Sequence, residues 1–292
     1  MRANPADYRL ISPAHLTEAL NLLDREPDRW LPLAGGTEIM VQYSAGRLGS
    51  RQLLNIGGLP ELKQISETGT VLRIGGGCTF TQLAHHSSIK AHFPLLATAA
   101  SWTGSIANQN RATIAGNIVN ASPAADSPPA LLAYEAELEL ISASGTRIVP
   151  YSEFHLSYKK TVLRPAELVL AILLPKRFDG WFGYTQKVGT RRAQAISKIC
   201  IAGVGKHNGR RVQALQIGIG AVAPVPIRLR KIEAALIGAE LTDIALEQAQ
   251  CRLLEEISPI DDIRSSAEYR KRVAANLLND LLQAFAAAEA SQ

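Results

Sequence analysis

The chain has few of the residues that build metal or cluster sites, and cysteine is the clearest case. Its 292 residues include only three cysteines, Cys78, Cys200 and Cys251. None of them forms a CxxC pair, and three thiols cannot supply a four-thiolate cluster. The pattern predicts buried free thiols in a reducing compartment. Any iron–sulfur cluster that works with this chain must therefore be bound by another one.

Long apolar runs are also missing from the sequence. Residues 168–174 form one of the longest runs, and they fit one buried strand better than a membrane span. Residues 1–7 contain no apolar stretch that resembles a secretion signal. We therefore expect a cytoplasmic protein without a membrane segment. Aromatic residues make up only 5%, and the net charge of +5 comes from scattered basic residues without a nucleic-acid motif. We expect no nucleic-acid partner.

No arrangement of side chains indicates a reaction carried out by the protein alone. His85 and His86 are adjacent and His92 follows, but no carboxylate or thiolate completes a metal-ligand spacing. No Ser/His/Asp, Cys/His or paired-carboxylate arrangement stands out. These absences predict neither a metal site nor a catalytic side chain. They are typical of proteins whose chemistry resides in an organic cofactor.

Two glycine-bearing loops are the most informative features that are present. The first spans residues 33–39 and reads LAGGTEI, and the second spans residues 113–117 and reads TIAGN. The second is followed by ASPAAD at residues 121–126. Glycine lacks a Cβ, so such a loop allows close approach of a bulky anion. Its successive N–H groups form a concave anion site. Two such loops suggest a ligand with an extended phosphate bridge, such as a dinucleotide cofactor.

Local patterns predict several helices. Apolar residues at positions i, i+3, i+4 and i+7 indicate an amphipathic helix over residues 13–25, with Ser12 as its N-cap. A second helix is expected over residues 37–47, directly after the first glycine loop. Residues 79–82 and 265–268 have capping-box patterns, each of which predicts the start of a helix.

Other patterns predict strands and a boundary between domains. Alternating apolar residues indicate a half-buried strand over 136–140, with a hairpin partner at 147–149. Two further strands are expected over 199–205 and 212–221, followed by helices. The polar stretch 176–180 is interpreted as a flexible boundary, which divides the chain into residues 1–176 and 177–292.

The two loops, in this order and spacing, resemble those of the FAD-binding medium subunit of the molybdenum hydroxylases, a family that includes xanthine dehydrogenase. The chain is similar in the same way to the medium subunit of carbon monoxide dehydrogenase. Residues 74–77 (IGGG), 158–165 (YKKTVLRP) and 187–196 (KVGTRRAQAI) extend the resemblance over nearly the whole chain. It implies an α+β fold. Residues 1–176 would form a two-lobed FAD-binding domain of the vanillyl-alcohol-oxidase/PCMH type, with two α/β lobes. Residues 177–292 would form a smaller α+β domain.

The resemblance also implies roles for individual residues. Backbone amides of residues 34–39 would hold the pyrophosphate and a ribose of FAD, and the second loop would hold the other side of the cofactor. Asp126 would form a hydrogen bond further along, although by itself it could also cap a helix that starts at Pro128. Lys187 would lie near the polar edge of the flavin, where a cation favours the anionic reduced form. The implied FAD-binding residues are Leu33, Ala34, Gly35, Gly36, Thr37, Glu38, Ile39, Thr113, Gly116, Asn117, Asp126, Lys187, and Leu168 and Val169 beside the isoalloxazine ring.

Partners follow from the same resemblance. FAD would be the cofactor of this chain, whereas molybdopterin would lie on a large partner subunit and [2Fe-2S] clusters on a small one, in a heterotrimer. Electrons would pass from the clusters through FAD to NAD⁺ or another acceptor. The segment 158–165 favours the xanthine dehydrogenase type. Aldehyde, nicotinate and carbon monoxide enzymes share this subunit, and the cysteine count argues against the aromatic-CoA type, which carries an extra cluster-binding insertion.

Two alternatives stay open at this point. A stand-alone flavoenzyme would need its own acid and base residues, and none is evident in the sequence. A non-catalytic scaffold subunit would have lost FAD, and Ala115 is the only hint of this, because the second loop of the family usually reads Gly-Gly-Asn. If that position needs φ > 0, alanine costs about 1 kcal/mol or more.

Overall fold

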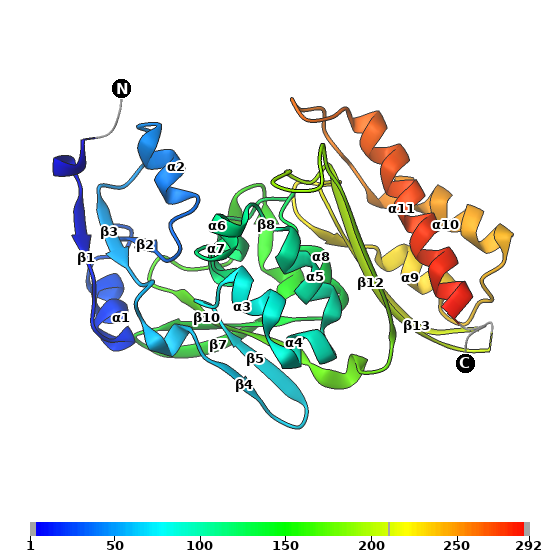
Figure 1. Cartoon of the computed structure of the whole chain (residues 1–292), viewed down its shortest axis with the longest axis horizontal. Coiled ribbons are helices and arrows are strands. Elements are labelled where there is room, and N and C mark those ends of the chain that lie inside the picture. The colour runs from blue at the N-terminus through cyan, green and yellow to red at the C-terminus, as the bar shows by residue number, and fades with distance from the viewer. Residues whose placement is uncertain (1–3, 210, 289–292) are drawn as a thin grey trace.

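The computed structural model describes residues 4–209 and 211–288, which form three lobes in a row (Figure 1). The N-terminal lobe contains a parallel three-stranded sheet in the order β1-β3-β2. One helix of this lobe packs against the sheet through Leu16, Leu20 and Leu23, which are buried. The elements of the lobe are β1 (Arg9–Ile11), α1 (Leu16–Arg25), β2 (Leu31–Leu33), α2 (Ile39–Ser44) and β3 (Gln52–Asn55).

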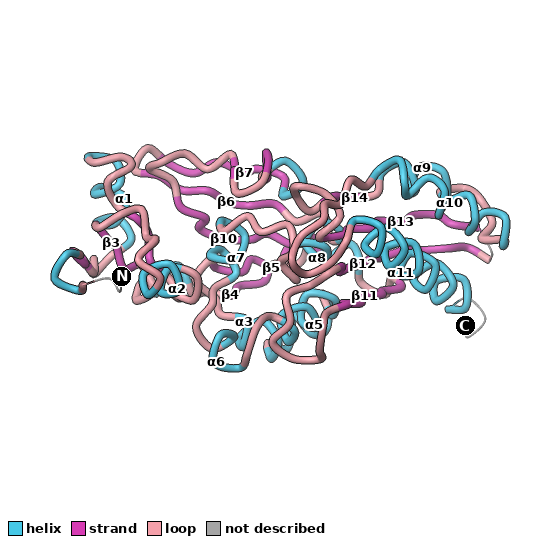
Figure 2. The backbone as a smooth tube through the Cα atoms, turned by 90° about the horizontal axis from the view of Figure 1, so that it is seen from above, coloured by secondary structure: helices cyan, strands magenta, loops and turns pink. Residues whose placement is uncertain are grey.

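The middle lobe is an antiparallel five-stranded sheet in the order β4-β5-β10-β6-β7, with helices packed against it (Figures 1 and 2). Its central strand separates two cores, because Leu168 and Leu170 pack toward the N-terminal lobe while Val169 and Ile172 pack under the helices. The elements are β4 (Ile65–Glu67), β5 (Val71–Gly75), α3 (Phe80–His85), α4 (Ser87–His92), α5 (Pro94–Trp102), α6 (Ile106–Gln109), α7 (Ile114–Val119), α8 (Pro128–Ala133), β6 (Glu137–Ser142), β7 (Gly145–Pro150), β8 (His155–Ser157), β9 (Lys160–Thr161) and β10 (Leu168–Pro175).

The C-terminal lobe is an antiparallel sheet in the order β11-β12-β13-β14. Alternate residues of its second strand serve two cores: Ile199 and Ile201 face the C-terminal helices, and Ala202 and Val204 join the core of the middle lobe. The sheet is thus shared between the lobes, and α8 of the middle lobe contacts β12 and β13. The elements are β11 (Phe182–Val188), β12 (Ile199–Asn208), β13 (Arg211–Gly220), β14 (Ile227–Arg228), α9 (Arg230–Leu236), α10 (Asp243–Glu256) and α11 (Ala267–Ala288).

The first capping box is confirmed, and the second is wrong. The Thr79 hydroxyl accepts a hydrogen bond from the Gln82 amide, and the Gln82 side chain accepts one from the Thr79 amide. At α11, by contrast, the hydroxyl that accepts from the Tyr269 amide is that of Ser266. The predicted cap is therefore one residue too early.

Two predicted helices are shorter in the structure. The first begins at Leu16 rather than at residue 13, because the Ser12 hydroxyl accepts a hydrogen bond from the Asn55 side chain and does not cap the helix. The second ends at Ser44, shortly before Gly46, whose φ of 65° is incompatible with helix continuation. No helix among residues 4–209 and 211–288 is both long and apolar enough to cross a membrane.

The segment 176–180 begins with a short 3-10 helix, Lys176–Phe178, that is anchored to the middle lobe, and its flexibility stays a prediction. Phe178 is buried in the core of the middle lobe, and Asp179 pairs with His92 at 2.9 Å. The strand β11 that follows was not predicted at all. A domain boundary after residue 176 stays a prediction.

Candidate functional site

The two glycine loops come from different lobes and meet in space. A Cβ atom added to Gly35 would lie only 1.9 Å from the backbone oxygen of Arg111, just before the second loop. The Arg111 side chain also donates a hydrogen bond of 3.4 Å to the Gly35 carbonyl. Glycine is therefore required at position 35 for the two loops to touch. The next residue, Gly36, has a φ of 76°, which L-residues with a side chain rarely adopt.

The first loop presents backbone donors. None of the amides from Gly36 to Ile39 has a backbone acceptor within the described part of the chain. The loop follows strand β2 directly and leads into α2, so these consecutive N–H groups lie on one tight turn. Consecutive unpaired amides of this kind can donate hydrogen bonds to a phosphate group. The loop therefore fits the phosphates of a dinucleotide.

The second loop is built differently, because most of its amides already have partners. Ile114 and Ala115 donate to the Cys78 and Gly76 carbonyls at 3.0 Å, and Gly116 donates to the Thr113 hydroxyl at 3.2 Å. Thr113 therefore acts as the N-cap of α7. The group that this loop can still offer to a ligand is the side chain of Asn117.

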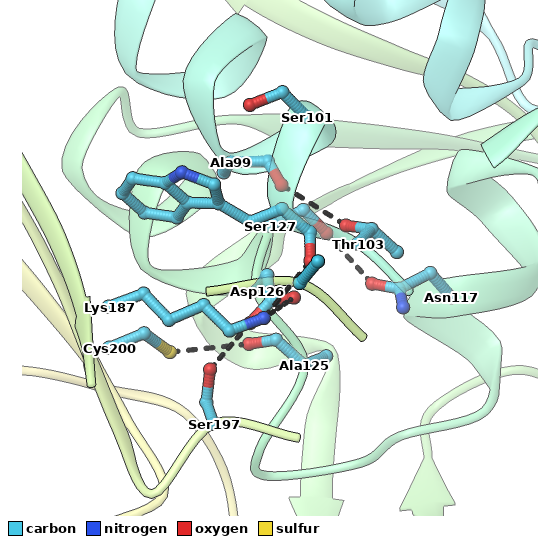
Figure 3. Close-up of polar contacts among 12 residues, drawn as sticks. Ala99, Ser101, Thr103, Asn117, Ala125, Asp126, Ser127, Lys187, Ser197 and Cys200 are labelled. Carbon is cyan, nitrogen blue, oxygen red and sulfur yellow. Dashed lines mark hydrogen bonds and ion pairs between the residues drawn. The ribbon is translucent and has the colours of Figure 1, made fainter. Parts of the chain in front are cut away.

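The Asn117 amide is oriented by a buried serine. The Ser127 hydroxyl donates to Asn117 Oδ1 at 2.8 Å (Figure 3), and this contact leaves the NH₂ end of the amide for a ligand. Ala115 carries no strain, because it lies within α7 and is not among the residues with positive φ. The alanine at this position therefore does not by itself indicate a lost site.

A buried ion pair lies at the joint between the middle and C-terminal lobes (Figure 3). Lys187 Nζ, from β11, is 2.7 Å from Asp126 Oδ2, and both side chains are 8% exposed. Lys187 also donates to the Trp102 carbonyl at 3.0 Å, and the Ser197 hydroxyl donates to Asp126 Oδ1 at 2.6 Å. Three stretches of sequence, around Trp102, around Asp126 and from Lys187 to Ser197, thus meet at one carboxylate and one ammonium group.

The electrostatics of the pair reflect its burial. Burial raises the pKa of Asp126 above its ordinary value, while the Lys187 ammonium and the Ser197 hydroxyl oppose that rise. Beside the pair, the Cys200 thiol donates to the Ala125 carbonyl at 3.5 Å, and burial raises its pKa as well. The prediction that Asp126 could cap α8 is wrong: Ser127 is the N-cap residue, and no side chain caps that helix.

Leu168 and Val169 lie in different cores, although both are only 5% exposed. Leu168 packs in the core shared with the N-terminal lobe, whereas Val169 packs in the core below the second loop. The Val169 carbonyl lies against Gly76, which in turn contacts Ala115. Val169 thus supports the second loop from behind, and a direct contact of either residue with a flavin ring stays a prediction.

Several residues around these loops carry no signal in the sequence. They include Arg111, Ser127 and Ser197. Lys159, by contrast, lies in the segment 158–165 that extends the resemblance, and its ammonium group donates to the Asn120 side chain at 2.6 Å. Each depends on a contact that the fold brings together. The prediction that all three cysteines are buried fails for Cys251, which is exposed, whereas Cys78 and Cys200 are buried.

Comparisons with known proteins place both parts of the chain in one family. The family model described as "FAD binding domain in molybdopterin dehydrogenase" matches residues 6–177, and the model described as "CO dehydrogenase flavoprotein C-terminal domain" matches residues 184–285. The protein is therefore a two-part FAD-binding chain of the molybdopterin dehydrogenases.

Individual relatives are similar over almost their full length. The xanthine dehydrogenase FAD-binding subunit of Escherichia coli O157:H7 is 36% identical, over 88% of each chain. The carbon monoxide dehydrogenase medium chain of Hydrogenophaga pseudoflava is 28% identical, over 96% of this chain and 97% of the relative. A solved structure of carbon monoxide dehydrogenase from the same organism has a TM-score of 0.92 over 96% of this chain and 97% of that one. The chain belongs to the FAD-binding medium subunits of the xanthine dehydrogenase and carbon monoxide dehydrogenase family.

Proposed function

We propose that this chain is the electron-transfer subunit of a molybdopterin-dependent hydroxylase of the xanthine dehydrogenase type. A large molybdopterin subunit and a small [2Fe-2S] subunit would be its partners. FAD, when bound, supplies an acceptor for single electrons and a donor of electron pairs to NAD⁺ or another oxidant. The observation that carries the proposal is the contact at Gly35, where the loops of two lobes meet beside a run of unpaired amides.

Each part of the site has a task in this proposal. The amides from Gly36 to Ile39 would bind the cofactor's phosphates, and the Asn117 amide would contact its other side. The Lys187 ammonium and its partner Asp126 would set the charge at the flavin's polar edge. The protein's own residues would bind, orient and shield the cofactor, and none of them would react.

Two variants test the cofactor site. Gly35→Ala places a methyl group within 1.9 Å of a backbone oxygen, so the loops must separate. We expect it to weaken FAD binding ~10-fold or more, since a strain of ~1.4 kcal/mol has that effect. Gly49→Ala is the matched control in the same lobe, because a Cβ there meets nothing within 4 Å. FAD titration followed by flavin absorbance, with thermal melts to check folding, separates the two. Equal affinities in both variants would contradict the proposed site.

The electron acceptor needs its own experiment. The FAD-loaded chain can be reduced by light without oxygen and then mixed with NAD⁺ or with oxygen. NADH formation supports NAD⁺ as the electron acceptor, whereas reoxidation by oxygen without NADH formation supports an acceptor other than NAD⁺. Stable association with purified large and small partner chains, measured by size-exclusion chromatography, tests the proposed assembly. A chain that turns over a reducing substrate by itself would favour the stand-alone flavoenzyme instead.

A further inference from the structure

We propose that Ser197 is a positioning residue: its hydroxyl holds the Asp126 carboxylate in the orientation that keeps Lys187 directed at the flavin's polar edge. The inference rests on the proposed function and adds a residue that no sequence motif marked. Ser197 lies in the loop between β11 and β12 and is fully buried.

The geometry supports a specific task for this hydroxyl. Its donor distance of 2.6 Å to Asp126 Oδ1 is typical of a hydrogen bond to a charged acceptor. The other oxygen, Oδ2, accepts from Lys187 at 2.7 Å, so each carboxylate oxygen has one donor. Without the serine, Oδ1 would be buried with no partner and the carboxylate could rotate. A buried polar group without a partner costs ~1–3 kcal/mol.

The loop between β11 and β12 has a residue that contacts Asp126 at each of its ends. Lys187 lies just before the loop, on β11, and Ser197 lies at its far end, two residues before β12 begins. Both contact Asp126, which belongs to the middle lobe. The orientation of the carboxylate therefore depends on the loop as well as on the lysine. The Trp102 carbonyl accepts a second hydrogen bond from the Lys187 ammonium group.

The titratable groups that face Asp126 are few. Lys187 approaches from β11 and Cys200 from β12, and α5 contributes only the Trp102 carbonyl. Beyond the thiol lies the buried Tyr151, whose phenol stays protonated because burial raises its pKa. Burial raises the pKa of Cys200 too, so the thiol is neutral near pH 7. Loss of the serine hydrogen bond raises the pKa of Asp126 further, because that bond is one of the contacts that lower it.

The test compares Ser197→Ala with Cys200→Ala, a control that removes a buried group next to the pair without removing a donor to the carboxylate. The readout is the midpoint potential of the FAD-loaded chain as a function of pH. We expect a new break in the slope for Ser197→Ala, where Asp126 takes up a proton, and the wild-type profile for Cys200→Ala. A profile of Ser197→Ala that matches the wild type overturns the inference.

A double-mutant cycle excludes a merely structural role. In the Asp126→Asn background no carboxylate remains to titrate, so Ser197→Ala should add no change to the pH profile of the potential. An additional change of equal size in that background would overturn the inference. If Ser197→Ala does not fold, Ser197→Thr keeps the hydroxyl and Ser197→Val removes it at nearly the same size, and the same comparison applies.

The FAD-free protein gives an independent readout. Asp126 has a raised pKa in the folded state, so its contribution to stability falls as pH rises through the folded pKa. Ser197→Ala should move that loss to higher pH, measured by urea unfolding from pH 5 to 8. An unchanged pH dependence in the FAD-free chain contradicts the coupling of Ser197 to Asp126. Failure of the wild-type chain to bind FAD would instead contradict the proposed function. The urea unfolding of the FAD-free chain would still test the coupling between Ser197 and Asp126 in that case.

Discussion

Replacement of Lys187 by methionine should destabilise the joint between the middle and C-terminal lobes in a pH-dependent way. Methionine keeps the length of the side chain and removes its charge. The Asp126 carboxylate, 8% exposed and 2.7 Å from the ammonium group, would then be buried without a counter-charge. Removal of one partner of a buried pair costs ~3–5 kcal/mol. We expect a loss of that size at pH 8.

The cost should shrink at lower pH, because a protonated Asp126 no longer carries a buried charge. Without Lys187 the folded pKa of Asp126 rises further, since that ammonium group is the largest of the effects that lower it. The folded state then binds a proton more readily than the unfolded state, so stability decreases as pH rises. Each pH unit in this window changes the free energy of unfolding by at most ~1.4 kcal/mol.

Urea unfolding followed by tryptophan fluorescence measures this effect, since Trp102 lies at the joint. Wild type, Lys187→Met and the double variant Lys187→Met/Asp126→Asn should be compared at pH 5, 6.5 and 8. The double variant should recover most of the stability at pH 8, because its amide is neutral. An equal loss at all three pH values would refute the reasoning. So would a double variant that is no more stable than the single one.

Three further outcomes follow from other buried groups. Burial lowers the pKa of His155 to about 4. The free energy of unfolding of the wild type should therefore fall by ~2 kcal/mol as pH drops from 6.5 toward 4, a value that includes a discount for partial exposure. In urea unfolding, His155→Phe should not show this pH dependence. In a thiol-reagent titration Cys251 should react in the native state, whereas Cys78, with its pKa raised by burial to about 11, should react only after unfolding. Arg147→Met should cost ~2–3 kcal/mol by the same unfolding assay, less than a fully stranded buried charge, because the Glu167 carboxylate loses two 2.7 Å hydrogen bonds and keeps the one from the Arg164 amide.

Features with short-range partners could be predicted from the sequence. The capping box at Thr79 has both of its hydrogen bonds within three residues, so the local pattern contains all of its energetics. The start of α1 could not be predicted, because the Ser12 hydroxyl is bound by Asn55, 43 residues away. The polar strand β11 was missed for a similar reason. All its residues are half-buried or exposed, its apolar alternation (Phe182, Tyr184, Val188) is interrupted by Gln186, and its pairing with β12 makes it a strand.

In the candidate site, too, local features could be predicted from the sequence and contacts between distant residues could not. The sequence of the first loop predicts close approach, and the structure supplies the neighbour, Arg111, that makes glycine necessary. Resemblance to the family named Asp126 and Lys187 separately, and their pairing emerged only from the fold, since 61 residues separate them. Ser197, 71 residues from Asp126, had no local pattern and no family motif to mark it.

Stability alone does not require the Asp126–Lys187 pair at this joint. Well-packed apolar residues of similar volume often stabilise a buried joint as well as an ion pair, or better by ~1–4 kcal/mol. The proposed role of the pair beside the cofactor would account for a lysine and an aspartate at this buried joint. The variant Lys187→Met/Asp126→Leu separates the two explanations. It should fold with a stability within ~1–3 kcal/mol of wild type, because the buried Ser197 hydroxyl loses its acceptor, while FAD affinity and the pH dependence of the potential change. Unchanged FAD binding and potential in that variant would show that the pair only holds the lobes together.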